Sequence, residues 1–185
     1  MTKIKPKLAL IVAATVDGEI GYKNTIPWKL KGDLPRFKKL TMGNVVISGR
    51  STHETLPEVM EGRIRIVMSR SPEYVSEVHD PLNHIYGVSS MDEALELARS
   101  FKTEMIFFIG GASIYEEALS IVDKAYVTLV YKTAPRYDTK IKNFRFDEKD
   151  WISVDCVPVV EHHTLFPQID IPSHSYYTFE RIEKN

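Results

Sequence analysis

Residues 105–115 read Met105-Ile106-Phe107-Phe108-Ile109-Gly110-Gly111-Ala112-Ser113-Ile114-Tyr115, and they join an apolar run to a glycine pair and a helical pattern. Glycines let a backbone turn sharply and approach a ligand closely. The helix start that follows presents unpaired N–H groups and the positive end of its dipole to an anion. The order of strand, glycine turn and helix therefore suits a phosphate site. The spacing lacks a full G-x-G-x-x-G fingerprint, and a plain tight turn accounts for the pair equally well.

Other short apolar runs recur along the chain, and several are continuously apolar rather than alternating, which suits a sheet that is covered on both faces. The predicted strands are 8–14, 45–47, 64–68, 105–109 and 125–131. Helical patterns stand between them at 33–40, 50–56, 91–101 and 113–119. Two later runs, 151–160 and 175–182, are expected to form an antiparallel pair. Strands that alternate with short helices predict an α/β domain with a largely parallel sheet, whose ligands bind at the carboxyl ends of the strands.

The composition is that of an ordinary globular protein, since 43% of the 185 residues are hydrophobic and 26% are charged. We expect a single domain over residues 1–185. The 24 Lys and Arg against 25 Asp and Glu give a net charge of −1, which points to neither a nucleic acid nor an anionic membrane as partner. No apolar stretch reaches the roughly 18 residues of a transmembrane helix. We therefore predict a monomer that binds a small molecule.

The single cysteine, Cys156, excludes an intramolecular disulfide and favours a reducing compartment, for which we predict the cytoplasm. Because Ile152, Val154 and Cys156 alternate with polar residues, the thiol is interpreted as buried on a strand. The lysines ahead of residue 8 give the first apolar run some likeness to a secretory signal. The run is short and leads into a loop, so it is interpreted as a strand.

Two further predicted strands end in residues that suit phosphate. One leads into Gly49, Arg50, Ser51 and Thr52, and the other into Ser69-Arg70. An arginine can hold a phosphate with two hydrogen bonds, and hydroxyls can donate to its oxygens. The alternative is a capped helix with a solvated arginine. Three such strand ends together suggest one ligand with several phosphates, and a dinucleotide with a 2′-phosphate fits.

A carboxylate stands in an apolar helical stripe, because Leu30, Asp33, Leu34 and Phe37 are spaced as one helix face. Desolvating a carboxylate is costly unless it is paired, which makes Asp33 a candidate functional residue. The alternative is that Asp33 caps the helix, with Pro35 in the first turn. The spacing alone favours the cap.

The loop over residues 17–30 contains two glycines, an asparagine and a proline, and loops of this length are often functional. Within it, Trp28 is either an aromatic lid or a core anchor. His162-His163 have no third ligand at a suitable spacing, so we expect no metal site.

Taken in order, these pieces resemble dihydrofolate reductase over most of the chain. Each piece is weak alone, but Pro27-Trp28 followed by a helix-borne Asp33 and the later glycine turn is specific in combination. The matching residues are Leu10 to Ala14, Val16-Asp17, Ile20-Gly21, Asn24, Pro27-Trp28, Leu30, Asp33-Leu34, Phe37-Lys38, Gly49-Arg50, Thr52, Glu54, Gly62-Arg63, Ser69-Arg70, Ile109-Gly110-Gly111, Ile114-Tyr115, Thr128, Asp138-Thr139 and His174-Ser175-Tyr176.

The resemblance implies a single domain with an eight-stranded sheet, parallel except for an antiparallel C-terminal edge strand, flanked by four helices. It implies reduction of 7,8-dihydrofolate to tetrahydrofolate, with a hydride passing from NADPH to pterin C6 and a proton to N5. Asp33 and Trp28 would be the catalytic residues, with Asp33 holding the pterin and Trp28 positioning it together with an ordered water. The other substrate contacts would be Ile11, Phe37, Lys38, Arg63 and Thr128, of which Arg63 would pair with the substrate's glutamate carboxylate.

The implied cofactor residues fall into a nicotinamide group and a phosphate group. They are Ala13, Ile20, Gly21, Gly49, Arg50, Ser51, Thr52, Ser69, Arg70, Ile109, Gly110, Gly111, Ala112, Ser113, Ile114 and Tyr115. The chain departs from the family pattern where His53 replaces a usual Trp and Ser48 a usual Met. It also departs at 140–144 and at 161–172.

Two rival functions stay open at this point. A related reductase of the same fold, such as that of riboflavin synthesis, shares the cofactor turns but not the pair formed by Trp28 and Asp33. A non-catalytic binding module could also keep the fold as a scaffold. The combination of Asp33, Thr128, Arg63 and Arg50 favours a working enzyme.

Overall fold

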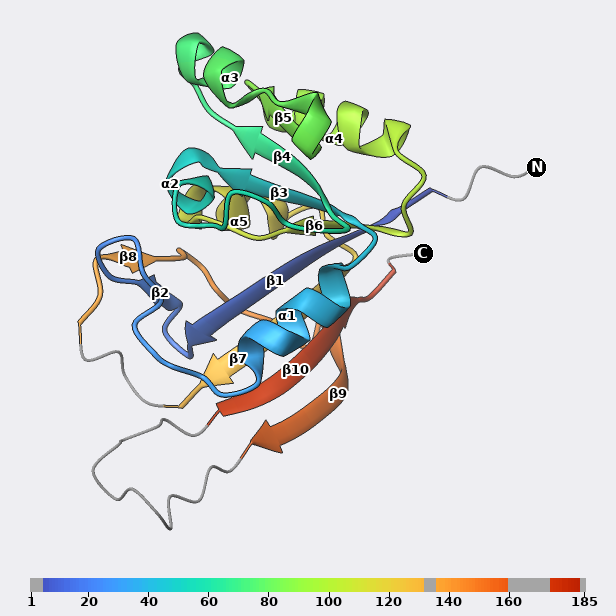
Figure 1. Ribbon diagram of the computed structural model, residues 1–185. Coiled ribbons are helices and arrows are strands. Elements are labelled where there is room, and N and C mark those ends of the chain that lie inside the picture. The colour runs from blue at the N-terminus through green and yellow to red at the C-terminus, as the bar shows by residue number, and fades with distance from the viewer. Residues whose placement is uncertain (1–4, 132–135, 160–173, 184–185) are drawn as a thin grey trace.

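The computed structural model describes residues 5–131, 136–159 and 174–183, which form a large sheet, a small sheet and surrounding helices (Figure 1). The strands are β1 (Lys7–Thr15), β2 (Glu19–Gly21), β3 (Val45–Gly49), β4 (Ile64–Met68), β5 (Ile85–Val88), β6 (Met105–Phe108), β7 (Lys124–Val130), β8 (Thr139–Lys140), β9 (Trp151–Val159) and β10 (His174–Arg181). The helices are α1 (Asp33–Thr41), α2 (Arg50–His53), α3 (Pro72–Val78), α4 (Met91–Ser100), α5 (Ala112–Ala118) and the 3-10 turn η1 (Pro81–Asn83).

The large sheet has eight strands in the order β5-β4-β3-β6-β1-β7-β10-β9, and every pair from β5 to β7 is parallel. Strand β10 runs antiparallel to both β7 and β9. The mostly parallel eight-stranded α/β sheet is therefore confirmed. One detail differs from the expectation: the antiparallel C-terminal strand β10 is not at the edge, because β9 pairs along its outer side.

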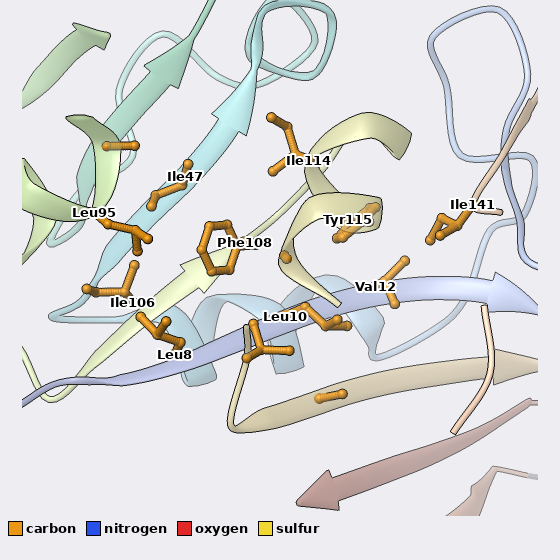
Figure 2. Close-up of a cluster of buried hydrophobic side chains, with 14 of the residues drawn as sticks. Leu8, Leu10, Val12, Ile47, Leu95, Ile106, Phe108, Ile114, Tyr115 and Ile141 are labelled. Atoms are coloured by element: carbon orange, nitrogen blue, oxygen red, sulfur yellow. The ribbon is translucent and has the colours of Figure 1, made fainter. Parts of the chain in front are cut away.

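Strand β1 lies in the middle of the sheet and buries both of its faces. Leu8, Leu10 and Val12 point into one hydrophobic cluster, which contains the buried faces of α4 and α5 (Figure 2). Ala9 and Ile11 point into a second cluster, against which α1 packs. The continuously apolar sequence of β1 thus serves two cores at once, as expected for a strand covered on both sides.

The structure contains elements that the sequence patterns did not indicate. Helix α3 brings the described α-helices to five rather than the expected four, and β5 lies beyond β4 at the far edge. The sequence does carry a signal for α3, since Ser71 caps it with a hydrogen bond from the Tyr74 N–H at 3.3 Å and Pro72 follows. Strand β5 is short and contains a glycine, so its pattern is weak.

The interpretation of Cys156 as a buried thiol is wrong. Strand β9 is the sheet edge, and Cys156 is exposed on it together with Ile152 and Val154. Alternation predicts a strand correctly, but it does not tell whether anything covers the apolar side of an edge strand.

Among the described helices, none is long and apolar enough to span a bilayer.

Gly87 in β5 allows α3 to approach the sheet. A Cβ atom placed on Gly87 would clash with the backbone carbonyl of Val75 in α3. We predict that Gly87→Ala lowers the free energy of unfolding by about 2–3 kcal/mol, because backbone must move to accept the methyl group. Urea denaturation followed by circular dichroism measures this.

The matched control is Gly43→Ala, where the added Cβ meets nothing within 4 Å but φ is +75°. That variant carries only the conformational cost of a positive φ, about 1 kcal/mol. Equal losses in the two variants would show that α3 does not press on Gly87.

Candidate active site

One large cavity of about 1060 Å³ opens at the carboxyl ends of the central strands. It receives the end of β1, the turns after β3, β4 and β6, and the first residues of α1 and α5. Most of the residues proposed from the sequence line it: Ile11, Ala13, Ile20, Gly21, Asp33, Phe37, Gly49, Arg50, Ser51, Thr52, Ser69, Arg70, Ile109, Gly110, Gly111, Ala112, Ser113, Ile114, Tyr115 and Thr128.

Three of the proposed residues do not line this cavity. Trp28 is 8% exposed and packs with Val130 and Leu30, so it anchors the loop in a small core. Lys38 is exposed on α1. Arg63 is half-buried, and its Nε donates to the Glu61 carbonyl at 3.3 Å, while burial lowers the pKa of its guanidinium.

The sequence patterns missed part of the cavity wall. Ser89, Ser90 and Met91 line it where β5 ends and α4 begins. The same logic of strand end and helix start would have found them had β5 been recognised. Leu34 also lines the cavity and is 70% exposed, so this residue of the apolar stripe faces the open pocket, while Phe37 also packs against the second hydrophobic cluster.

Asp33 sits at the first position of α1 and its side chain turns toward the sheet. Gly32 is the N-cap residue, with φ of 87°, and no side-chain cap bond forms. The interpretation of Asp33 as the cap is therefore wrong. Instead, Thr128 of β7 donates its hydroxyl hydrogen bond to Asp33 Oδ1 at 2.6 Å. Thr128 is 1% exposed, so this bond ties the carboxylate to the middle of the sheet.

Two charged or polar groups surround Asp33. The Tyr115 hydroxyl donates to the Ile11 carbonyl at 2.8 Å, and burial, together with the negative charge of Asp33, raises the pKa of the Tyr115 phenol. Arg36 follows Asp33 by one helical turn, and its guanidinium lies 4.5 Å from the centre of the Tyr176 ring. Burial lowers the pKa of Arg36, while the charge of Asp33 opposes that change. The charge of the carboxylate thus acts on both the Tyr115 phenol and the Arg36 guanidinium.

The turns after β3 and β6 lie against each other. The Gly49 N–H donates to the Gly110 carbonyl at 2.7 Å, and the Gly110–Gly111 peptide is cis. A Cβ on Gly49 would approach Ile114 to 3.3 Å, and one on Gly111 would approach Thr52 Oγ1 to 3.4 Å. The approach at Gly49 is tighter than an ordinary contact, and Gly110 requires glycine through its φ of 111°. The starts of α2 and α5 thus lie beside one cavity.

Arg50 is the cation at this end of the cavity. Its Nε lies 2.8 Å from Glu54 Oε1, and this hydrogen bond raises the pKa of Arg50. Both side chains are about half exposed, at 53% and 43%. Ser48, which replaces a usual Met, is fully buried before the turn and does not line the cavity.

The loop over residues 17–30 is fixed by the segment around β8. The Lys23 N–H donates to Asp138 Oδ2 at 2.8 Å, and the hydrogen bonds to this carboxylate lower the pKa of Asp138. In the departure at 140–144, Ile141 and Phe144 are buried beneath Gly18. The departure therefore fills a core under the loop. The second departure, 161–172, and His162-His163 lie outside the described residues.

The comparisons with known proteins agree with this geometry. A sequence model of the family described as dihydrofolate reductase matches residues 7–177. The chain belongs to the dihydrofolate reductase family. It is an NADPH-dependent oxidoreductase that reduces dihydrofolate, so the reaction implied by the resemblance is confirmed. The comparisons do not support the alternative that the chain is a reductase of riboflavin synthesis.

Relatives match over nearly the full chain. Dihydrofolate reductase type 8 of Escherichia coli is 35% identical over 179 residues, which is 96% of this chain and 97% of that protein. Dihydrofolate reductase of Pneumocystis carinii is 35% identical over 169 residues, 80% and 79% of the two chains. The solved structure of dihydrofolate reductase from Enterococcus faecalis, complexed with NADP(H) and RAB-propyl, has a TM-score of 0.76 at 29% identity, covering 96% and 97% of the chains.

The buried phenol of Tyr115 predicts a specific alkaline behaviour of this reductase. A raised pKa means that the folded protein keeps the Tyr115 proton at a pH where the unfolded chain, with a tyrosine pKa of about 10, has lost it. Stability from this group is present below pH ~10 and falls above it, by about 1.4 kcal/mol per pH unit. We predict that Tyr115→Phe makes the alkaline loss of stability shallower by that amount.

Urea denaturation between pH ~9 and ~11 measures the two slopes. The variant Tyr137→Phe, at a half-exposed ring, separates the loss of a buried phenol from the loss of any phenol. Parallel slopes for the wild type and Tyr115→Phe would show that the buried hydroxyl is not the cause.

Proposed function

We propose that Asp33 is the residue that holds the pterin of dihydrofolate and promotes protonation of N5. The observation that carries this proposal is the hydrogen bond from Thr128 to Asp33 Oδ1 at 2.6 Å, inside the cavity. With that oxygen fixed, Oδ2 makes no hydrogen bond to the described residues. The carboxylate is thus oriented before the substrate arrives, and such preorganisation lets a group act on a bound ring without a rearrangement cost.

The walls around Asp33 suit a flat ring. Ile11 and Phe37 line the same cavity from β1 and α1. We assign them to the two faces of the pterin and to the neighbouring benzoyl group. Apolar walls with a few fixed polar groups are typical of small-molecule sites. Trp28 lies outside the cavity lining, and its buried Nε1 makes no hydrogen bond to the described residues. We therefore assign Trp28 to positioning the ring through an ordered water.

The glutamate tail of dihydrofolate needs a cation. Arg63 forms no ion pair within the described part of the chain, and only its Nε is held, by a backbone carbonyl. We assign it to the tail carboxylate, with the exposed Lys38 assisting. Guanidinium and carboxylate match as two parallel hydrogen bonds. Both residues lie outside the lining of the large cavity, which agrees with a tail that leaves the pocket.

The phosphate end of the cavity fits NADPH. The turns at Gly49 and Gly111 pass so close to their neighbours that a Cβ atom would meet one, and Arg50, Arg70 and several hydroxyls line the cavity beside them. When bound, NADPH supplies the hydride. The loop residue Ile26, 54% exposed, lines the cavity on its open side, where we assign it to the exclusion of water. A monomeric state, a cytoplasmic location and the lack of a nucleic-acid partner stay predictions.

We predict that Asp33→Asn keeps the fold and lowers kcat by about 10²–10⁴, the span of general acid catalysis. Loss of NADPH absorbance in the presence of dihydrofolate measures the rate. The matched control is Asp92→Asn, which removes a carboxylate from the first turn of α4. Near-native turnover of Asp33→Asn at a pH where dihydrofolate in solution is unprotonated would contradict the assignment.

The hydrogen bond from Thr128 has a separate test. Thr128→Val keeps the shape of the side chain but removes its donor to Asp33. Because a hydrogen bond to a charged group contributes about 1.5–3 kcal/mol, we predict that kcat/KM for dihydrofolate falls about 10- to 100-fold. The KM for NADPH is expected to stay within about twofold, since Thr128 is not assigned to the cofactor. An unchanged kcat/KM would mean that Asp33 is oriented by other contacts.

Tight binding of NADPH without any oxidation in the presence of dihydrofolate would favour the scaffold alternative. Isothermal titration of the wild-type protein with NADPH, run beside the absorbance assay, separates the two outcomes.

A further inference from the structure

We propose that Tyr74 of α3 determines the preference for NADPH over NADH, by holding the guanidinium of Arg50 in the plane that binds a 2′-phosphate. This inference rests on the proposed assignment of Arg50 to the cofactor phosphates. Nothing in the sequence patterns singled out Tyr74, which lies in a helix that those patterns missed.

The ion pair with Glu54 does not fix Arg50 by itself. Only Nε is engaged, at 2.8 Å, and no other Arg50 nitrogen makes a hydrogen bond to the described residues. Both partners are about half exposed, at 53% and 43%. Exposed ion pairs are weak and leave a long side chain free to rotate. A second contact is needed to hold the plane of the guanidinium.

The ring of Tyr74 provides this second contact. The Arg50 Cζ lies 4.3 Å from the centre of the Tyr74 ring, a distance at which a guanidinium is attracted to an aromatic face. Tyr74 is itself fixed by the start of α3, because its N–H donates to the capping hydroxyl of Ser71 at 3.3 Å. Arg50 and Ser71 both line the cavity, so Tyr74, which does not line it, contacts the lining from behind through these two residues.

His53 supports Tyr74 from below. The two rings meet edge to face, with centroids 6.5 Å apart and an interplanar angle of 78°. Arg65 Nη1 lies 3.2 Å from His53 Nδ1, and Arg65 Nη2 donates to the carbonyls of Pro57 and Glu58 at 2.8 and 3.2 Å. Because an arginine has donors only, His53 Nδ1 accepts from Arg65, and burial together with the charge of Arg65 lowers the pKa of His53.

A chain of contacts thus runs from the sheet to the cavity. Arg65 of β4 hydrogen-bonds His53, the His53 ring packs against Tyr74, and the Tyr74 ring lies under the guanidinium of Arg50. Arg65 is 2% exposed, so the chain begins at a fixed point. It also gives a role to the departure at His53, where the family usually has Trp. The imidazole can accept a hydrogen bond from Arg65 at Nδ1, which an indole cannot do because its nitrogen is only a donor.

The arrangement favours a phosphate over a hydroxyl. Arginine recognises a phosphate through parallel hydrogen bonds in the plane of its fork, so the gain depends on the orientation of that plane. With Nε on Glu54 and Cζ over the Tyr74 ring, both Nη nitrogens of Arg50 make no hydrogen bond to the described residues and are available to a phosphate. NADH has only a 2′-hydroxyl at the corresponding position, so a fixed orientation of the Arg50 guanidinium adds little to its binding affinity.

The experiment measures kcat and KM with NADPH and with NADH for the wild type, Tyr74→Phe and Tyr74→Leu. Phe keeps the aromatic face, and Leu removes it. We expect Tyr74→Leu to raise the KM for NADPH roughly 5- to 20-fold, with the KM for NADH and both kcat values within about twofold. Tyr74→Phe is expected to stay within about twofold of the wild type. The ratio of the two cofactors does not depend on the fraction of folded enzyme.

Two controls complete the design. Tyr86→Leu removes a tyrosine from neighbouring β5 that packs against Phe101 and does not line the cavity, so it reports loss of packing alone. Should Tyr74→Leu not fold, Tyr74→Gln removes the ring while keeping a side chain suited to an exposed helix. If the KM values for NADPH and NADH rise equally, or neither rises, Tyr74 only packs α3 and the inference is overturned.

Arg50→Gln distinguishes this failure from a failure of the proposed cofactor site. If Arg50→Gln loses the preference for NADPH and Tyr74→Leu keeps it, Arg50 binds the phosphate without help and only the inference falls. If Arg50→Gln keeps the preference, the assignment of Arg50 itself is wrong, and the inference falls with it. Loss of the preference in both variants, with no further loss when they are combined, supports the inference.

Discussion

The whole arrangement depends on the burial of both faces of β1. Its neighbours β6 and β7 leave no edge open, so Leu10 must find apolar partners on one side of the sheet and Ile11 on the other. Helices are therefore required on both faces, and parallel strands with right-handed crossovers supply them. The same crossovers bring the carboxyl ends of β1, β3 and β6 to one edge. The cavity lies there because the chain leaves β1 in one direction to build β3 and returns to its flank with β6.

Within this sheet and its helices, placing the Asp33 carboxylate among apolar side chains carries a desolvation cost. Asp33 stands on the apolar side of α1, where desolvation opposes its charge. The structure offsets this cost with the hydroxyl of Thr128 and with Arg36 one turn further along the helix. Gly32 makes the arrangement possible, because it begins the helix with a positive φ and leaves Asp33 free of any capping role. A carboxylate bound to its own helix end could not face the sheet.

The sequence predicted the central strands well and the edges poorly. Residues 64–68 match β4 residue for residue, because four of the five residues of this strand are apolar. Strand β5 was not predicted, because it has only four residues and one of them is a glycine. The glycine is required by the close approach of the Val75 backbone, which no local sequence pattern indicates. Spacing could not tell a capping Asp33 from an inward one, because the answer depends on the backbone of Gly32. The exposure of Cys156 likewise depends on which strand forms the edge.

The two ends of the cavity are stabilised by different interactions, and this accounts for the departure from the family pattern at His53. At the Asp33 end, one short buried hydrogen bond sets the geometry, so the residues on both sides of it have little freedom to change. At the Arg50 end, the cation is exposed, and its orientation comes from supporting contacts that can be built in several ways. His53, Arg65 and Tyr74 are one such construction, in which a buried arginine and a neutral imidazole support the aromatic ring. The departure at His53 therefore belongs to the supporting contacts at the Arg50 end, whereas Asp33 and Thr128 match the family pattern.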